Sequence, residues 1–286
     1  MTAILTHIRN ILHPIGLWII LIVALHACTE RIDIATEEEF QKLAVEGYIT
    51  PEKQEIKLTE TSGYFSQIAP KPVREAVVTV SYSAGTFQFS ESPDHPGYYY
   101  PEDNFEVILE ETYMLSIDLK EPVGGETNFE SQATMPRRAN AVDSTRAIWR
   151  EDFETWIIEL YAFEPEGPDF YMFNAYVNGV AVTDSLSRTG VADDRIVDGG
   201  YLYGIYILFL NEDELQFGDT LTVSTSTISE DYYRYLVEAQ TELRPKNPLF
   251  SGPPANVKSN ISNGALGYFA VYSSFFSTSI VREIED

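Results

Sequence analysis

The chain has 286 residues, 44% of them hydrophobic, and carries 19 Lys+Arg against 44 Asp+Glu, a formal net charge of −25. A surface that acidic repels phosphate backbones, so nucleic acid is excluded as a partner. The single cysteine rules out a disulfide within the chain, and a zinc site with several His or Cys ligands is excluded because three of the four histidines lie among the first 26 residues, in the predicted signal. No dinucleotide fingerprint, phosphate loop or nucleophile elbow occurs either, so we expect no cofactor, no metal and no catalytic residue.

Residues 1–27 are predicted to be a signal peptide. Arg9 is their only charged residue, and the apolar stretch at 15–24 matches the roughly 7–15 apolar residues of secretory signals. It is too short to span a bilayer, which takes about 20 residues. Cys28 directly follows the small residue Ala27, which resembles a bacterial lipoprotein signal and implies that Cys28 is acylated, for example with palmitate. His26 departs from that pattern, and the alternatives are an ordinary secretory signal or a membrane anchor, with Cys28 incidental.

Residues 28–39 are polar and acidic and are predicted to be the lipidated N-terminus and a tether to the fold. Without Arg9, 18 basic side chains remain against 44 acidic ones, so the acyl chain is the expected contact with outer-membrane lipid. Glu30 and Asp33 partly resemble the acidic surface-export signals of lipoproteins in the phylum Bacteroidota. That resemblance implies an anchor in the outer membrane that faces the cell exterior, with the periplasmic face as the alternative.

Residues 40–136 are predicted to form an immunoglobulin-like β-sandwich. Leu43, Val45, Gly47 and Ile49 recur at the period of two expected of a strand with one buried face. Further short strands are expected at 54–60, 76–82, 86–89, 97–100, 112–119 and 129–134, separated by turns that contain Gly or Pro. Short antiparallel strands at this spacing are typical of sandwiches, here without an inter-sheet disulfide.

A break at 136–140 is the predicted domain boundary, and residues 140–286 are predicted to form a second β-rich domain. Its strands are expected at 155–163, 170–177, 180–182, 201–210, 220–228, 264–276 and 277–284. Asn178-Gly179 suits a two-residue hairpin, because both residues tolerate positive φ. The expected architecture is therefore all-β, with two antiparallel β-sandwich domains.

One helix is predicted in the second domain, over residues 230–243. Ser229 is its expected N-cap and Pro245 its stop. Tyr232, Tyr235, Leu236, Ala239 and Leu243 fall on one stripe of the helix, so we expect the helix to cover a sheet.

Acidic residues suggest two kinds of chemistry. Residues 193–200 begin like a calcium loop, but counting from Asp194 puts Ile196 and Ile205 where oxygen donors are needed. The helical calcium loop is therefore excluded, and a non-standard calcium site remains open. Paired carboxylates for glycoside hydrolysis also remain open, because no spacing singles out one pair.

Aromatic residues are the candidate contacts for a ligand or partner. Tyr98, Tyr99, Tyr100 and Trp156 are chosen because aromatic rings pack on partners and stack on sugars; the alternative is that they belong to the core. His95 is the only histidine after the signal and is expected in an exposed turn.

Two tripeptides are candidate O-glycosylation sites. Asp184-Ser185-Leu186 and Asp219-Thr220-Leu221 resemble the Asp-Ser/Thr-aliphatic acceptor of exported Bacteroidota proteins, which implies modification of Ser185 and Thr220.

Several short motifs occur in an order that resembles one protein family. They include Cys28-Thr29-Glu30, Ala44-Val45-Glu46-Gly47-Tyr48-Ile49-Thr50, Pro96-Gly97-Tyr98-Tyr99, Phe217-Gly218-Asp219-Thr220-Leu221, Pro253-Pro254-Ala255-Asn256-Val257 and Gly267-Tyr268-Phe269. Together they resemble a family of Bacteroidota lipoproteins catalogued as domain of unknown function 4249. The resemblance covers nearly the whole chain after the signal. It implies an outer-membrane lipoprotein, commonly encoded beside a TonB-dependent receptor, and supplies no catalytic residue.

The function expected from these observations is that of a surface-exposed, non-enzymatic lipoprotein that helps a TonB-dependent transporter capture its ligand. Two alternatives remain. One is a carboxylate-based hydrolase acting on a surface polymer, and the other is a structural or adhesion module of the envelope.

Overall fold

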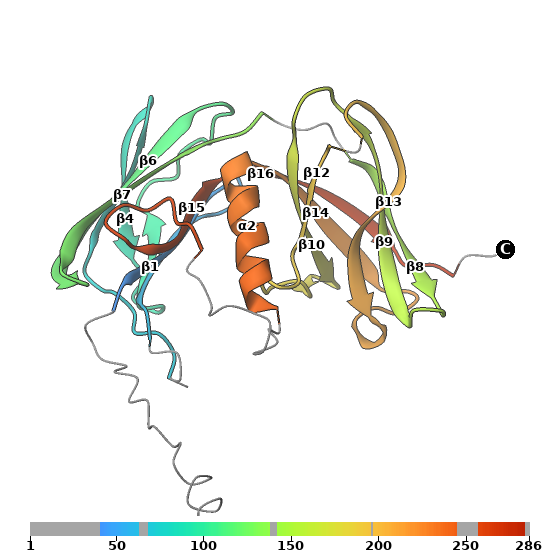
Figure 1. Cartoon of the computed structure of the whole chain (residues 1–286), viewed down its shortest axis with the longest axis horizontal. Helices are drawn as coiled ribbons and strands as arrows, with labels where there is room; N and C mark the ends of the chain where they lie inside the picture. The colour runs from blue at the N-terminus through green and yellow to red at the C-terminus, as the bar shows by residue number, and fades with distance from the viewer. Residues whose placement is uncertain (1–40, 63–67, 138–141, 196, 245–256, 284–286) are drawn as a thin grey trace, which may run out of the picture. The chain divides into compact units, whose positions relative to one another are not determined.

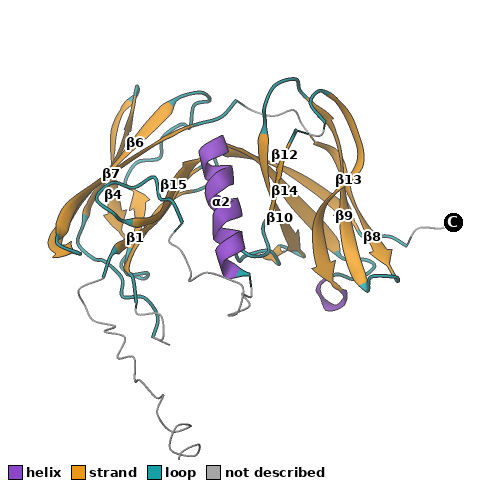
Figure 2. Ribbon diagram, viewed as in Figure 1, coloured by secondary structure: helices purple, strands orange, loops and turns teal. Residues whose placement is uncertain are grey.

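The computed structural model of the chain describes residues 41–62, 68–137, 142–195, 197–244 and 257–283. The signal peptide, Cys28, the tether and Pro245 lie outside these residues. Residues Glu39–Asp286 form one compact unit. Strands make up most of the described residues, so the predicted all-β class is confirmed (Figures 1 and 2).

The first sheet contains eight strands. Their hydrogen-bonded order is β15 (Leu266–Val271), β1 (Leu43–Ile49), β2 (Gln54–Glu60), β5 (Tyr98–Pro101), β4 (Gly85–Glu91), β3 (Val77–Tyr82), β6 (Thr112–Val123) and β7 (Glu126–Thr134). Every strand expected between residues 43 and 134 is present. Only β1 and β15 run parallel; the other neighbours are antiparallel.

One core lies on the inner face of this sheet. β1 buries Leu43, Val45 and Ile49 and exposes Glu46, as its period of two predicts. Inward side chains from all eight strands belong to the same buried cluster. A single sheet can enclose a core on one of its faces only if the sheet curves. The first sandwich is therefore formed by one curved sheet rather than by two separate sheets.

The second sandwich contains two sheets. The larger sheet has the order β11 (Val180–Ala181), β10 (Phe170–Val177), β14 (Thr220–Ile228) and β16 (Ser273–Ile280). A short strand, β12 (Gly190–Asp193), also pairs with β10. The smaller sheet has the order β13 (Gly200–Asn211), β9 (Thr155–Glu164) and β8 (Val142–Arg150). Trp156 and Leu160 of β9 share a core with Phe173 of β10. Asn178 and Gly179 have φ of 51° and 83°, so the predicted two-residue hairpin is confirmed.

Helix α2 (Glu230–Leu243) is the only α-helix in the described part of the chain, and its predicted limits are confirmed. The Ser229 hydroxyl accepts a hydrogen bond of 3.3 Å from the backbone N–H of Tyr232, as expected of an N-cap. Of the predicted stripe, Tyr232, Leu236 and Ala239 are buried and Tyr235 is partly buried, whereas Leu243, in the last turn, is exposed. Tyr232 and Leu236 form a third core with residues of β10, β14 and β15. No helix in the described residues is both long and apolar enough to cross a membrane.

Two consecutive strands near the C-terminus join the first and second sandwiches. β15 pairs with β1, and β16 begins two residues after β15 ends and pairs with β14 (Figure 1). The domain limits expected from the sequence put both strands in the second domain, whereas β15 is an edge strand of the first sheet.

β8 and β12 are not predicted, because β8 mixes charged and apolar residues on its outer face and β12 has four residues.

Candidate functional site

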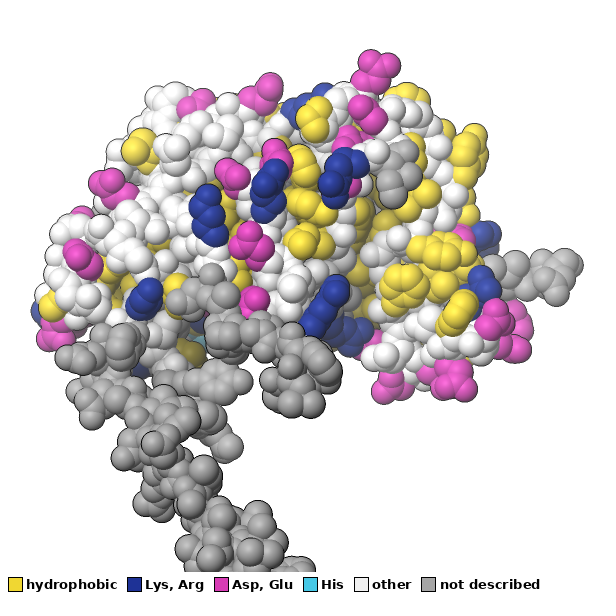
Figure 3. Space-filling view, in the orientation of Figure 1, with side chains coloured by type: hydrophobic (Ala, Val, Ile, Leu, Met, Phe, Trp, Pro, Cys, Tyr) yellow, Lys and Arg dark blue, Asp and Glu magenta, His cyan; other side chains and the backbone are white. Residues whose placement is uncertain are grey.

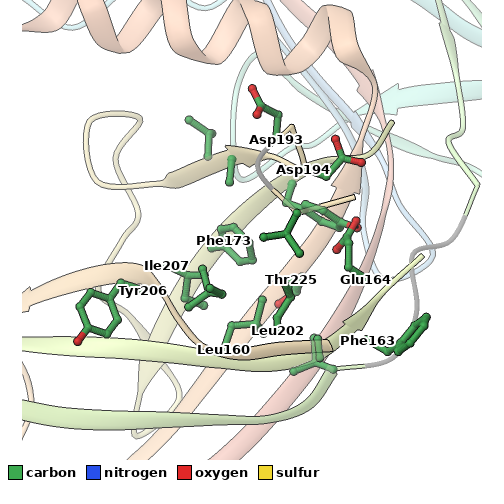
Figure 4. Close-up of a pocket in the computed structure, with 17 residues that line it drawn as sticks. Leu160, Phe163, Glu164, Phe173, Asp193, Asp194, Leu202, Tyr206, Ile207 and Thr225 are labelled. Atoms are coloured by element: carbon green, nitrogen blue, oxygen red, sulfur yellow. The ribbon is translucent and has the colours of Figure 1, made fainter. Parts of the chain in front are cut away.

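A cavity of about 320 Å³ lies between the two sheets of the second sandwich (Figure 4). β9 and β13 line one side of the cavity, and β10, β12 and β14 line the other. Its wall is mostly apolar and includes Leu160, Ala162, Phe173, Leu202 and Ile207.

Irregularities in β13 explain why the sheets do not close over this space. The pairing of β13 with β9 shifts register between Tyr203 and Ile205 and again between Tyr206 and Leu208. Gly204, at the first shift, has φ of +64°. Each bulge reorients the following side chains and bends the strand. As a result Ile205, Tyr206 and Ile207 all line the cavity, although a regular strand would turn alternate residues away.

Thr225 places an unsatisfied hydroxyl group in the cavity wall. It lies on β14 opposite Phe173 of β10, only 8% of it is exposed, and its Oγ1 has no hydrogen-bond partner in the structure. A buried polar atom without a partner costs about 1–3 kcal/mol. Such groups in native proteins are usually satisfied by water, an ion or a ligand, so this hydroxyl marks a place where a polar atom would bind.

Three buried carboxyl groups converge at one end of the cavity. Glu164 ends β9, Asp169 precedes β10 and Asp194 follows β12, and an oxygen of each lies within 4.8 Å of the others. We call these three residues the carboxyl cluster. Glu164 and Asp194 line the cavity directly (Figure 4). The end of β9, the start of β10 and the end of β12 therefore bring together groups that are up to 30 residues apart in the chain.

Hydrogen bonds hold the carboxyl cluster in place. The Tyr171 hydroxyl donates to Oε1 of Glu164 at 2.8 Å, and the backbone N–H of Asp169 donates to Oδ2 of Asp194 at 2.8 Å. Arg137 donates to both carboxylate oxygens of Asp169, at 3.1 and 2.6 Å. The same guanidinium also donates to the backbone oxygen of Glu166 at 2.9 Å. Of the three carboxylates, the Arg137 guanidinium therefore forms its ion pair with Asp169.

Burial changes the protonation of the cluster. The pKa of Glu164 is raised to about 7: loss of hydration is the main cause, the negative charges of Asp169 and Asp194 add to it, and the hydrogen bond from Tyr171 and the charge of Arg137 act in the opposite direction. Burial and the adjacent Glu164 also raise the pKa of Tyr171, which stays protonated. The cluster therefore holds or releases one proton near neutral pH.

The carboxyl cluster is also the place where a metal ion would find ligands in the described residues. The predicted acidic turn contributes Asp194 to it, whereas Asp193 pairs with Arg195 and accepts a hydrogen bond from Tyr233 at 3.0 Å. The other two oxygen donors come from Glu164 and Asp169, outside that turn. The sequence left a non-standard calcium site open, and its ligands here would differ from the set that the turn suggested.

The candidate aromatic contacts do not form one site. Tyr99 is fully buried and donates a hydrogen bond to the backbone oxygen of Val73, so it belongs to the first core. Tyr98 lies under the Lys57 ammonium, and Tyr100 donates to Glu55 at 2.9 Å.

Trp156 is the fourth candidate contact, and it is 4% exposed and packs between Trp149 and Phe217. Tyr99 and Trp156 thus follow the alternative of a core role.

Exposed aromatic rings gather instead on the outer face of β13. Tyr203 is 78% exposed and Phe209 is also exposed, whereas Tyr206, which is exposed as well, lies at the cavity. Figure 3 shows hydrophobic side chains over the part of the molecule where Figure 1 places β13, β9 and β8.

The remaining candidates occupy turns and strand ends. Ser185 is exposed, and Thr220 is the half-buried first residue of β14; their glycosylation stays a prediction. His95 is exposed in the turn at 92–97, as expected, and its backbone N–H donates to Ser92 Oγ at 3.2 Å.

Sequence reasoning missed Glu164, Asp169 and Thr225. The available signal was weak: Glu164 and Asp169 flank the turn between two strongly apolar strands, where an acidic residue normally faces solvent. Only the packing of β12 beside β10 reveals that they face a third carboxylate.

A protein-family model described as a domain of unknown function (DUF4249) matches residues 29–276, which is most of the chain. Among curated proteins, no match was found.

Proposed function

The chain belongs to the DUF4249 family, and from that premise we propose that it is a non-enzymatic lipoprotein that captures a small ligand for a TonB-dependent transporter. In this proposal acylated Cys28 anchors it in the outer membrane, facing the cell exterior, and the ligand binds in the cavity of the second sandwich. The observation that carries the proposal is this cavity, with its apolar wall and its few convergent polar groups.

The cavity has the properties of a small-molecule site. Ligand pockets usually measure about 300–1,000 Å³, and they are lined by hydrophobic side chains with a small number of polar groups that orient the ligand. Here the volume is about 320 Å³, and the polar groups are the Thr225 hydroxyl at the wall and Glu164 and Asp194 at one end. The size suits a molecule of one or two rings rather than a polymer.

Copurification from the native host tests the transporter partnership. A tagged copy of the chain should recover a TonB-dependent receptor, identified by mass spectrometry, and a tagged unrelated lipoprotein should not. Recovery of no outer-membrane receptor under several growth conditions would contradict the partnership.

The anchor is tested separately. Cells grown with a labelled palmitate precursor should incorporate label into the wild-type chain and not into the Cys28→Ser variant. Unlabelled wild-type protein would exclude the lipoprotein anchor without bearing on the cavity.

A hydrolase is the second candidate function, favoured by one observation. Glu164 has its pKa raised to about 7, as the general acid of a glycosidase does, and a second carboxylate, Asp194, lies nearby. Release of sugars from a panel of surface glycans, abolished in Glu164→Gln, would support the hydrolase over the capture protein. The third possibility, a structural or adhesion module, draws on the exposed aromatic face of β13; a growth defect confined to one nutrient would argue against it.

A further inference from the structure

We propose that the cavity selects an organic cation: a molecule with an apolar body, an ammonium-type group bound at the carboxyl cluster and a polar substituent at Thr225. This inference rests on the proposed function of ligand capture and deepens it by naming the class of ligand.

The charge balance at the end of the cavity favours a cation. Glu164, Asp169 and Asp194 lie within 4.8 Å of one another, and Arg137 is the basic group that pairs with the cluster, through Asp169. Asp193 also lines the cavity, but Arg195 neutralises it. Among the residues that the structure describes, Glu164 and Asp194 therefore face the cavity without an ion-pair partner of their own. A buried ammonium group would pair with them, whereas an anionic ligand would be repelled.

The body of the ligand is expected to be apolar because the wall is apolar. Leu160, Phe173, Leu202 and Ile207 offer dispersion contacts and no hydrogen bonds. A free inorganic ion would leave this surface uncovered. The size of the cavity and the identity of its wall therefore point to an amphipathic organic cation rather than to a metal ion.

Thr225 is an observation independent of the cluster. It comes from β14, its hydroxyl is buried in the same cavity and its Oγ1 lacks a partner. A ligand that carries a hydroxyl or carbonyl group along its body would satisfy it. An unsatisfied hydroxyl lowers the stability of the ligand-free protein and lets the ligand gain a hydrogen bond on binding.

The arrangement also predicts how binding depends on pH. The groups that face Glu164 are Asp169 and Tyr171 at the start of β10, Asp194 after β12 and, through Asp169, Arg137. An ammonium group favours the ionised form of Glu164, so binding below neutral pH releases a proton. Affinity for the cation should therefore rise as the pH increases from 6 to 8, because Glu164 loses its proton in that range.

The test compares three probes with one hydrocarbon body: 4-phenylbutylamine, 4-phenylbutan-1-ol and 4-phenylbutyrate. The full-length protein is purified in detergent, and binding is measured by calorimetry against a detergent blank. We expect the amine to bind at least about tenfold more tightly than the alcohol at pH 8, the acid not to bind, and the preference for the amine to shrink at pH 6.

Three variants locate the binding. Glu164→Gln should weaken the amine about tenfold and leave the alcohol within about twofold, while Asp152→Asn, an exposed carboxylate paired with Arg150, should change neither. Thr225→Val replaces the hydroxyl group with a methyl group of similar size. It should raise the melting temperature of the ligand-free protein while leaving the preference for the amine intact, which also shows that the variant is folded.

Several results would overturn the proposal. Equal affinities for the amine and the alcohol, tighter binding of the acid, or no binding of any probe would each reject the cation class. Calcium alone, if it raised the melting temperature of the wild type and not of Glu164→Gln, would assign the cluster to a metal ion instead. None of these results bears on copurification with a transporter, so failure of the ligand class and failure of the proposed function are distinguishable.

Discussion

Glu164 is a buried acidic residue at the end of the cavity, and its burial has a structural cost. Its side chain is 4% exposed, it accepts a hydrogen bond from Tyr171, and two further carboxyl groups lie beside it. Burial raises its pKa from 4.5 to about 7, so the folded protein binds a proton that the unfolded chain releases at lower pH. An acid whose pKa is raised by folding destabilises the native state once the pH exceeds the unfolded value.

The first prediction concerns the pH dependence of stability in Glu164→Gln. Raising the pH from about 4.5 to 7 should destabilise the wild type relative to the variant by up to about 3 kcal/mol, and the difference should stay constant above pH 7. Calorimetry at pH 5, 6, 7 and 8 should therefore show the melting temperature of the variant rising above that of the wild type by several degrees. Glu126→Gln, at an exposed position that begins β7, is the control. Parallel curves for wild type and Glu164→Gln would contradict the assignment.

Arg137 is the second residue on which the site depends. Its side chain is 45% exposed, but the side chain of Asp169, which it binds, is 3% exposed. Removing one partner of a buried pair leaves an uncompensated charge, which typically costs about 3–5 kcal/mol when both partners are buried.

Since the arginine is half in solvent, we expect Arg137→Ala to lower the free energy of unfolding by about 2–3 kcal/mol. Arg150→Ala breaks an ion pair of 2.9 Å between two exposed side chains and should have a clearly smaller effect, because solvent screens the pair. Denaturant titration measures both variants. Equal, small losses would show that Asp169 is stable without its arginine.

Among the elements of the fold, β15 depends most on one residue. Gly267 has φ of +90°, and a Cβ there would lie 1.9 Å from the backbone oxygen of Val45 on β1. No side chain fits that contact, so the parallel pairing of β1 with β15 requires glycine.

We therefore expect Gly267→Ala to lower the free energy of unfolding by about 3–5 kcal/mol, through both backbone strain and separation of the strands. Gly264 is the matched control, because it has φ of +72° and nothing within 4 Å of the added Cβ. Gly264→Ala should cost about 1 kcal/mol. The comparison uses denaturant titration, and similar losses in the two variants would mean that β15 is not held closely against β1.

At the scale of the whole molecule, the path of the chain links the two sandwiches. β15 supplies Phe269 and Val271 to the first core, and β16 pairs with β14 in the second sandwich. The preceding segment adds Ile261 and Ala265 to the first core. The strands β1–β7 therefore lack part of their core until the last 30 residues of the chain are in place.

The prediction at this scale concerns a fragment of residues 40–137. Without β15 it exposes the edge of β1 and loses four buried core residues, so it should show no cooperative thermal transition. The full-length protein should melt cooperatively, and adding a peptide of residues 257–283 should restore order to the fragment. Near-ultraviolet circular dichroism reports both effects. A fragment that melts cooperatively near the temperature of the full chain would show that the first sandwich is an independent domain.

Much of the secondary structure was predictable because its signals are local. The alternation in β1, the Asn178-Gly179 hairpin and the Ser229 cap each depend on a few neighbouring residues, and each is found where the sequence predicts it. The sequence did not predict β8, because its outer face carries the charged residue Arg146 rather than an apolar residue. Arg146 is accommodated there by an ion pair with Glu159 of β9.

By itself, the sequence determined the all-β class, the position of the helix and the family to which the chain belongs. Only the tertiary structure decided that β15 forms an edge of the first sheet and that the carboxyl cluster and the buried hydroxyl of Thr225 belong to one cavity. The physical reason is the separation along the chain of the residues that determine each feature. Strand period, turns and caps follow from residues adjacent in the chain, whereas a cavity and its carboxyl groups depend on the register of strands that are far apart in it.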